Sequence, residues 1–115
     1  MSKTVYEFDC YGTIAKVTIN YSQYMDPKNV AVILNDANDG SCWAKLSTNI
    51  RSLPDGQFAV DTNNCPTAED FLSKYNIATS TGKSIQSGFC TYPIYALTET
   101  EYNKYLNFKR EHNLK

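Results

Sequence analysis

The chain has 115 residues, of which 42% are hydrophobic, 20% charged and 13% aromatic, and its net charge is −1. A chain of this length can build one ordinary hydrophobic core, so the sequence predicts a single domain over residues 1–115. Nine tyrosines supplement the aliphatic side chains. The near-neutral charge argues against a polyelectrolyte or disordered chain.

The charge distribution argues against direct binding of nucleic acid. The short basic group of Lys109, Arg110 and Lys115 lies at the C-terminus, where cations are typical of a helix end. Duplex-binding proteins neutralise several phosphates with clustered Lys and Arg, and this sequence has no such cluster. We therefore expect the partner to be a protein of the host.

The sequence has no signal-peptide pattern and no run of about 20 apolar residues that could span a bilayer. We therefore expect a cytoplasmic protein without membrane association. There the four cysteines, at positions 10, 42, 65 and 90, should be reduced thiols. Their spacing lacks the paired cysteines of a zinc site, so the sequence predicts neither a metal nor another cofactor.

The first sixty residues are predicted to form five strands. Alternation of apolar and polar residues indicates a hairpin at the N-terminus, and a continuous apolar run from Val30 to Leu34 indicates a central strand covered on both faces. The predicted strands span residues 3–11, 13–21, 30–34, 42–50 and 58–60.

The second half of the chain is predicted to contain two short helices. Apolar residues at helical spacing follow Thr67, which is the expected N-cap of a helix ending near Asn76. The sequence Thr98-Glu99-Thr100-Glu101 has the form of a capping box and predicts a second helix over 98–112.

The polar stretch 79–88 lies between these helices and is predicted to be an exposed loop, followed by a strand over 89–97. Pro93 places part of that strand at an edge, a bulge or a strand end. The resulting order is βββββαβα. The predicted fold is α+β, with an antiparallel sheet of five to six strands and two short helices.

Motifs of catalysis are weak or absent in this sequence. The single histidine, His112, lies three residues from the end, which is a poor position for a general base. Gly82-Lys83-Ser84 resembles the end of a phosphate-binding loop, but the upstream glycine is replaced by Ile77. We therefore expect a protein that is not an enzyme.

Aromatic residues supply the candidate interaction site. Alternation places Trp43 on the same face as Lys45, and Tyr and Trp are enriched at protein interfaces. Four tyrosines could extend this surface from Trp43: Tyr21 and Tyr24, near the loop before the central strand, and Tyr92 and Tyr95, which flank Pro93. The alternative is core packing, with the C-terminal helix covering Trp43. The tyrosines expected in the core are Tyr6, Tyr75, Tyr102 and Tyr105.

Part of the sequence resembles a known family. The segment from Thr81 to Leu97 contains Thr-Gly-Lys, Ser-Gly-Phe and Pro-Ile-Tyr-Ala-Leu, and residues 3–8 with Tyr11-Gly12 add a weaker match. These motifs resemble a family of short uncharacterised proteins, a domain of unknown function, from Gram-positive bacteria, their phages and conjugative elements. The resemblance implies a mobile-element setting and no catalytic residues. The helix over 98–112 extends past the motif and is interpreted as an addition of this chain.

Three hypotheses of function follow. The first is a non-enzymatic accessory protein that binds a host protein, such as an inhibitor of a host defence nuclease of the anti-CRISPR type. The second is a small ligand-binding or regulatory domain of a conjugative element, with a pocket lined by Tyr92, Tyr95 and Tyr105. The third, an enzyme using Cys90 or another thiol, is the least supported, and an ordinary thiol pKa near 8.5 at every cysteine would exclude it.

Overall fold

The computed structural model describes residues 4–10, 12–25 and 28–112. Within these ranges eight strands and two helices follow one another as β1 to β6, α1, β7, β8 and α2. The strands are β1 Tyr6–Cys10, β2 Thr13–Gln23, β3 Val30–Asp36, β4 Cys42–Lys45, β5 Ser47–Thr48, β6 Gln57–Val60, β7 Ala78–Ser87 and β8 Cys90–Leu97. The helices are α1 Ala68–Lys74 and α2 Glu99–Glu111. The α+β class is confirmed, whereas the predicted strand number and order differ.

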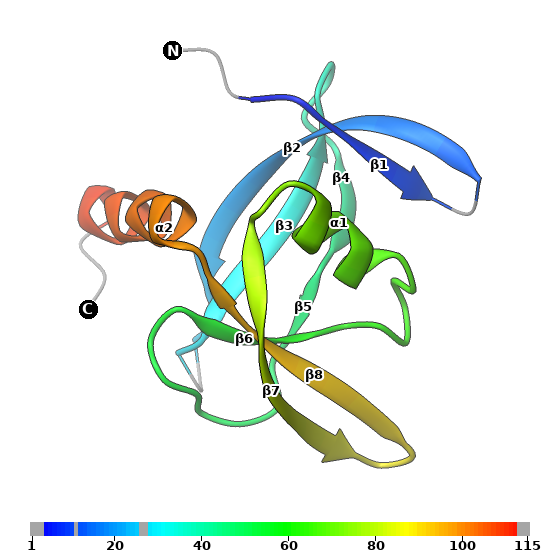
Figure 1. Ribbon diagram of the computed structural model, residues 1–115. Helices are drawn as coiled ribbons and strands as arrows, with labels where there is room; N and C mark the ends of the chain where they lie inside the picture. The colour runs from blue at the N-terminus through cyan, green and yellow to red at the C-terminus, as the bar shows by residue number, and fades with distance from the viewer. Residues whose placement is uncertain (1–3, 11, 26–27, 113–115) are drawn as a thin grey trace.

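The strands form two antiparallel four-stranded sheets, ordered β1-β2-β3-β4 and β5-β6-β8-β7 (Figure 1). The prediction of one sheet, with a single strand over 42–50, is therefore wrong. The chain changes sheets at Leu46, whose amide donates to Val32 in β3 and whose carbonyl accepts from the amide of Asp61 beyond β6. Leu46 is completely buried, so this corner lies in the core and splits the predicted strand into β4 and β5.

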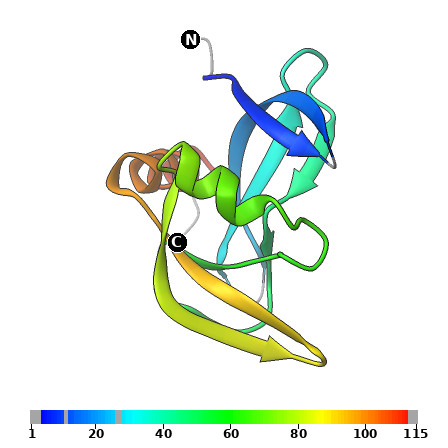
Figure 2. The same ribbon diagram turned by 45° about the vertical axis from the view of Figure 1, so that its right-hand side comes forward.

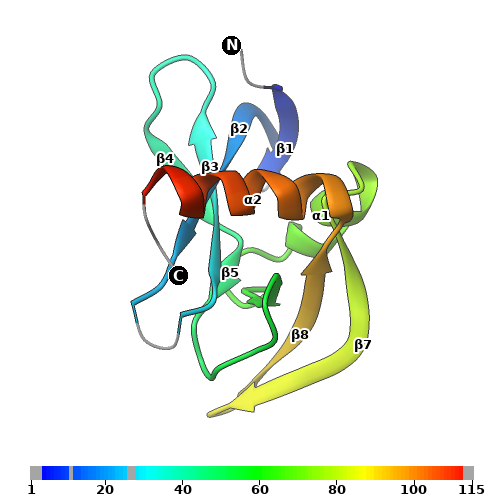
Figure 3. The same ribbon diagram turned by 90° about the vertical axis from the view of Figure 1, so that its left-hand side faces the viewer.

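One apolar cluster joins the two sheets and both helices. Alternate residues of β2 and β3, such as Val17 and Leu34, point inward toward Phe58 of β6. Phe71 of α1 and Tyr105 of α2 complete this cluster. Figure 3 shows α2 lying across β2 and β3.

Neither α1 nor α2, the two helices in the described residues, is long and apolar enough to cross a membrane.

The segment predicted as a loop over 79–88 is instead β7, the edge strand of the second sheet. Its residues are mostly exposed because β7 has a neighbour, β8, on one side alone, and Ile85 is its one buried residue after Ala78. A register shift between Ser80 and Ser84 interrupts the ladder. The apolar alternation that identifies a strand is therefore missing from this segment.

Both helices exist, and Thr67 and Thr98 are their N-cap residues as predicted, but neither side chain makes a capping hydrogen bond. The Thr67 hydroxyl donates to the Asp9 carbonyl of β1 rather than capping α1. The Thr98 hydroxyl donates to the carbonyls of Asn76 and Ile77, while Glu101 turns to Tyr21 and Lys104. Tertiary partners thus replace the local capping bonds, and the hydroxyls tie each helix to a neighbouring segment.

Candidate protein-binding surface

Trp43 is the largest aromatic side chain on the first sheet that remains open to solvent. It is 40% exposed, and its indole Nε1 donates to Oδ2 of Asp36 at 3.0 Å. The other oxygen of Asp36 accepts the backbone amides of Asn38 at 2.7 Å and of Asp39 at 3.1 Å. An exposed aromatic ring is thus anchored to the folded β3–β4 loop.

The β3–β4 register explains the position of Trp43. Leu34 pairs with Ala44 and Asn35 pairs with Cys42, so Trp43 is an extra residue on β4. A bulge of this kind re-aims a side chain relative to simple alternation. It brings the indole to Asp36, whose pKa is lowered first by the Asn38 amide and next by the Trp43 hydrogen bond.

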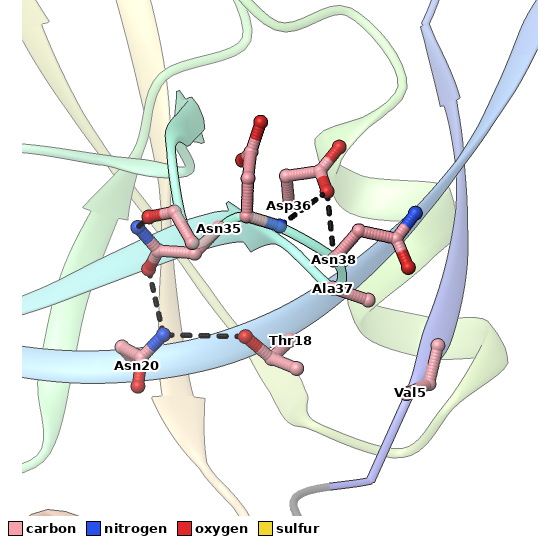
Figure 4. Close-up of a pocket in the computed structure, with 9 residues that line it drawn as sticks. Val5, Thr18, Asn20, Asn35, Asp36, Ala37 and Asn38 are labelled. Carbon is pink, nitrogen blue, oxygen red and sulfur yellow. Dashed lines mark hydrogen bonds between the residues drawn. The ribbon is translucent and has the colours of Figure 1, made fainter.

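An open groove of about 710 Å³ lies beside this anchor, between the β3–β4 loop and strands β1 to β3. Asn20 in β2 donates to Oδ1 of Asn35 at 2.6 Å, and Asn35 donates to the Gly40 carbonyl at 3.0 Å (Figure 4). Val5 lies on the β1 side of the same groove. The groove therefore has a floor of ordered amides next to an aromatic anchor.

The outer face of the first sheet is open to solvent. In β2, Ile14 and Lys16 on this face are exposed and Thr18 and Asn20 are half-buried, while Ala15 and Val17 on the opposite face are buried. Trp43 also remains exposed, so the interpretation that α2 covers Trp43 is wrong. Tyr102 and Tyr105 of α2 instead lie against Gly56 and Tyr21.

Two of the four candidate tyrosines belong to the interior. Tyr21 is 8% exposed and donates to Glu101 at 2.5 Å. Tyr95 is 6% exposed and donates to Glu69 at 3.0 Å. Burial raises the pKa of both hydroxyls, and the carboxylate partner raises each further. The expectation that Tyr21 and Tyr95 are exposed is therefore wrong.

The other two candidate tyrosines are half-buried. The hydroxyl of Tyr24 contacts Ser47 at the carbonyl and at Oγ. The Cys90 thiol beside the Tyr92 hydroxyl raises the pKa of Tyr92. Tyr92 also packs against the small cluster of Ala59, Ile85 and Ile94. Both rings have structural contacts, which leaves Trp43 as the candidate with the clearest access to a partner.

The sequence-based reasoning missed Phe89, which is fully exposed. It lies in the two-residue turn between β7 and β8, at the end of a hairpin that projects from the body of the protein (Figure 2). Gly88, the first turn residue, has φ +61°, as the type II′ hairpin turn requires. Ser-Gly-Phe was the available signal, because glycine followed by an aromatic residue inside a hairpin leaves that ring at the tip.

A second groove, of about 470 Å³, lies between α2 and strands β1 and β2. Tyr6, Ile19 and Phe108 give it apolar walls. The buried carboxylate of Glu101 lies at its side, bound to Tyr21 and to Lys104 at 2.9 Å. Neither of these two grooves is lined by the set predicted for a ligand pocket, which comprises Tyr92, Tyr95 and Tyr105.

The cysteines and acidic residues form no metal site in the part of the chain that the structure describes. Cys42 is exposed, Cys65 is buried and Cys90 is half-buried, and all three carry reduced thiols. The side-chain environment of Cys10 lies outside the described part of the structure.

The family described as Domain of unknown function (DUF4313) matches residues 18–113. This match includes α2, so the interpretation of that helix as an addition specific to this chain is wrong. Neither a curated protein nor a solved structure matches the chain. The family match covers well over half of the sequence, and the chain therefore belongs to the DUF4313 family, a family of uncharacterised domains.

Proposed function

We propose that this protein acts by binding another protein, as a cytoplasmic, non-enzymatic accessory protein of a phage or other mobile element. The observation that carries the proposal is Trp43, an exposed indole held at 3.0 Å by Asp36, which itself lines an open groove. Tryptophan is the side chain most enriched among residues that dominate binding energy at protein interfaces.

The anchoring of Trp43 favours tight binding. A side chain that is already fixed loses little rotational freedom when a partner covers it. The indole is fixed by Asp36, and Asp36 is fixed by two amides of the β3–β4 loop. The neighbouring Asn20 and Asn35 amides can hydrogen-bond to the polar groups that surround an apolar anchor on a partner.

The resemblance of the segment from Thr81 to Leu97 to proteins of Gram-positive bacteria, phages and conjugative elements supports a mobile-element setting. Small proteins in this setting commonly act by blocking a host protein. We therefore propose a host defence nuclease, such as a CRISPR effector, as the partner. Binding to a protein surface needs no cofactor and no nucleic-acid contact, which agrees with the balanced charge of the chain.

The test uses a Gram-positive host that carries an active CRISPR system. Expression of the wild-type protein should restore plasmid transformation, and the tagged protein should co-purify with the effector in stoichiometric amount. Trp43→Ala should weaken binding about 30-fold, as expected for a loss of roughly 2 kcal/mol at an anchor residue.

The matched control is Lys45→Ala, an exposed residue of the same strand. This variant should bind as the wild type does. The proposal is wrong if the wild type neither protects the plasmid nor retains a stoichiometric host protein. Equal binding by the Trp43→Ala and wild-type proteins would remove Trp43 as its basis.

The groove beside α2 favours a second candidate, a ligand-binding or regulatory domain of a conjugative element. Apolar walls with one buried carboxylate and one lysine suit a small amphipathic molecule. A thermal-shift screen against cellular metabolites tests this candidate, since a ligand that binds the folded state alone raises the melting temperature. The shift should disappear in Lys104→Ala and persist in Trp43→Ala.

A further inference from the structure

The outer half of β7, residues 84–87, is a sheet edge whose pairing direction follows from the hairpin. Ser87 and Cys90 flank a two-residue turn and form the hydrogen-bonded pair that closes it. Pairs then alternate, so Ser84 and Gln86 direct their backbone N–H and C=O groups away from β8. Pro93, opposite Ser84, fits this pattern because it has no N–H to donate to β7.

The outward groups of Ser84 and Gln86 have no backbone or side-chain partner among the described residues. No other described segment pairs with this edge of β7, so the position that a further strand would take is open. Unpaired edge groups of this kind are the template on which an extended chain adds to a sheet.

The other sheet edges are closed or short. On β1, the Tyr75 hydroxyl donates to the Glu7 carbonyl at 3.3 Å and accepts the Glu7 amide at 3.2 Å, and the Thr67 hydroxyl occupies the Asp9 carbonyl. β4 carries a bulge, and β5 has two residues.

The inner half of β7 is closed by its own side chains. The hydroxyls of Ser80 and Thr81 accept the amides of Gly82 and Lys83 at the register shift. The outer half of β7 is therefore the longest regular edge that the described structure leaves unprotected.

Phe89 follows this edge directly and is fully exposed. It lies two residues beyond Ser87, in the turn between β7 and β8, and Figure 2 shows that this hairpin projects from the body of the protein. The two features together offer backbone pairing and one hydrophobic contact.

We propose that residues 84–87 of β7, with Phe89, bind an extended segment of a partner protein as an added strand of the second sheet. This inference rests on the proposed function of protein binding and names a recognition site separate from Trp43. The faces of β7 define the chemistry of the segment. A residue beside buried Ile85 should be apolar, and its neighbours, beside Ser84 and Gln86, should be polar.

The charge of Lys83 and the surface area that this edge can bury further restrict the kind of partner. Lys83 is the one charged residue of β7 and is exposed, so it favours an acidic residue at the corresponding end of the segment. A second copy of this chain fits less well. Two four-residue edges bury far less than the roughly 1,200 Å² typical of a stable specific interface, whereas a partner segment can continue onto Phe89 and the hairpin face.

The test begins with a displayed library of random linear peptides selected against the wild-type protein. Enriched sequences should alternate apolar and polar residues and contain an acidic residue. A synthetic peptide of that sequence is then N-methylated at one backbone position at a time. Each methylation at a nitrogen that pairs with β7 should lower the peptide's affinity about tenfold, because it removes a backbone hydrogen bond and adds a steric clash. These positions should alternate along the peptide, and methylation at the positions between them should have little effect on affinity.

Variants of the protein provide the complementary measurement. Gln86→Pro removes an N–H that points away from β8, so it should keep the fold and lower peptide affinity at least about tenfold. Gln86→Ala is the matched control and should bind as the wild type does. Phe89→Ser should weaken peptide binding, and Trp43→Ala should leave it unchanged. This difference distinguishes the β7 site from the Trp43 site proposed to bind a host protein.

Three outcomes would overturn the inference: selection without an enriched peptide, N-methyl effects without a two-residue period, or equal binding by folded Gln86→Pro and Gln86→Ala. A wild-type dimer that Gln86→Pro converts to a monomer would also overturn it, because the occupant would then be a second copy. Each of these outcomes leaves the Trp43 test unaffected.

Discussion

The ring of Tyr102 in α2 lies directly against the backbone of Gly56, in the turn that precedes β6. A Cβ added at Gly56 would come within 2.9 Å of Cδ1 and 3.0 Å of Cε1 of Tyr102. The Tyr102 hydroxyl donates to the neighbouring Asp55, and the Gly56 carbonyl accepts the amide of Leu97, next to the start of α2. This contact is therefore one of the points at which α2 is seated on the second sheet.

Gly56→Ala should destabilise the protein by about 2–4 kcal/mol. Its φ of +81° strains any residue with a Cβ, and the hydrogen bond to Asp55 prevents the Tyr102 ring from moving away freely; each effect costs roughly 1–2 kcal/mol. Gly40→Ala is the control, because Gly40 has φ +78° and no neighbour within 4 Å of its Cβ position. Urea denaturation should give the larger loss for Gly56→Ala, and equal losses would contradict a role for the Tyr102 contact.

Tyr21→Phe should lower the free energy of unfolding by about 1.5–3 kcal/mol. The hydroxyl donates to the buried Glu101 carboxylate at 2.5 Å, and its loss leaves Lys104 as the remaining hydrogen-bond partner of that carboxylate among the described residues. Tyr24→Phe removes a half-buried hydroxyl that bonds to Ser47 and should cost about 1 kcal/mol. Thermal and urea unfolding of both variants measure the difference, and a Tyr21→Phe loss no larger than that of Tyr24→Phe would refute the prediction.

Stability should fall at alkaline pH. Burial raises the pKa of Tyr105 to about 12, and the pKa of Tyr21 is raised by burial and by Glu101, while the unfolded value of a tyrosine is 10.0. A phenol that holds its proton more tightly in the folded state contributes stability in full below pH 10.0, and this contribution is lost as the pH rises toward 12.

Ultraviolet titration of tyrosinate provides the measurement. Tyrosines with a raised pKa should ionise together with unfolding, at a pH well above the unfolded value of 10.0. Tyr105→Phe should reduce the steepness of the stability loss above pH 10. Titration of all nine tyrosines in one phase near pH 10, with the fold intact, would contradict the burial of Tyr21 and Tyr105.

Regular alternation predicted much of the fold. Val17, Leu34 and Phe58 mark strands whose apolar residues face one core, and the N-terminal hairpin and both helices were found close to their predicted bounds. The pattern failed where local sequence does not determine structure. Leu46 turns the chain between sheets through bonds to distant residues, and β7 has too few inward residues to show a two-residue period.

Alternation also predicted part of the candidate site, and it missed the parts that depend on contacts between distant segments. Trp43 was found from its polar neighbours on β4, although its contact with Asp36 depends on a bulge that alternation does not reveal. Tyr21 and Tyr95 were misplaced because proximity to a turn or a proline says nothing about carboxylates from distant segments. Glu101 and Glu69 accept hydrogen bonds from the hydroxyls of Tyr21 and Tyr95, and these bonds offset the cost of burying the two polar groups.

Trp43 is the single tryptophan of the chain, so its fluorescence reports on the proposed binding surface alone. At 40% exposure its emission should be red-shifted and readily quenched by acrylamide. Asp36→Ala removes the acceptor of the indole N–H and should lower the fluorescence anisotropy, because the ring gains rotational freedom. Acid should act in the same direction at a pH below the ordinary value of 3.8, since the Asn38 amide and Trp43 lower the pKa of Asp36. Asp39→Ala, which leaves the carboxylate that binds the indole in place, should keep the wild-type anisotropy. A blue-shifted, quencher-resistant emission in the wild type would show that Trp43 is covered and would remove it from the proposed interface.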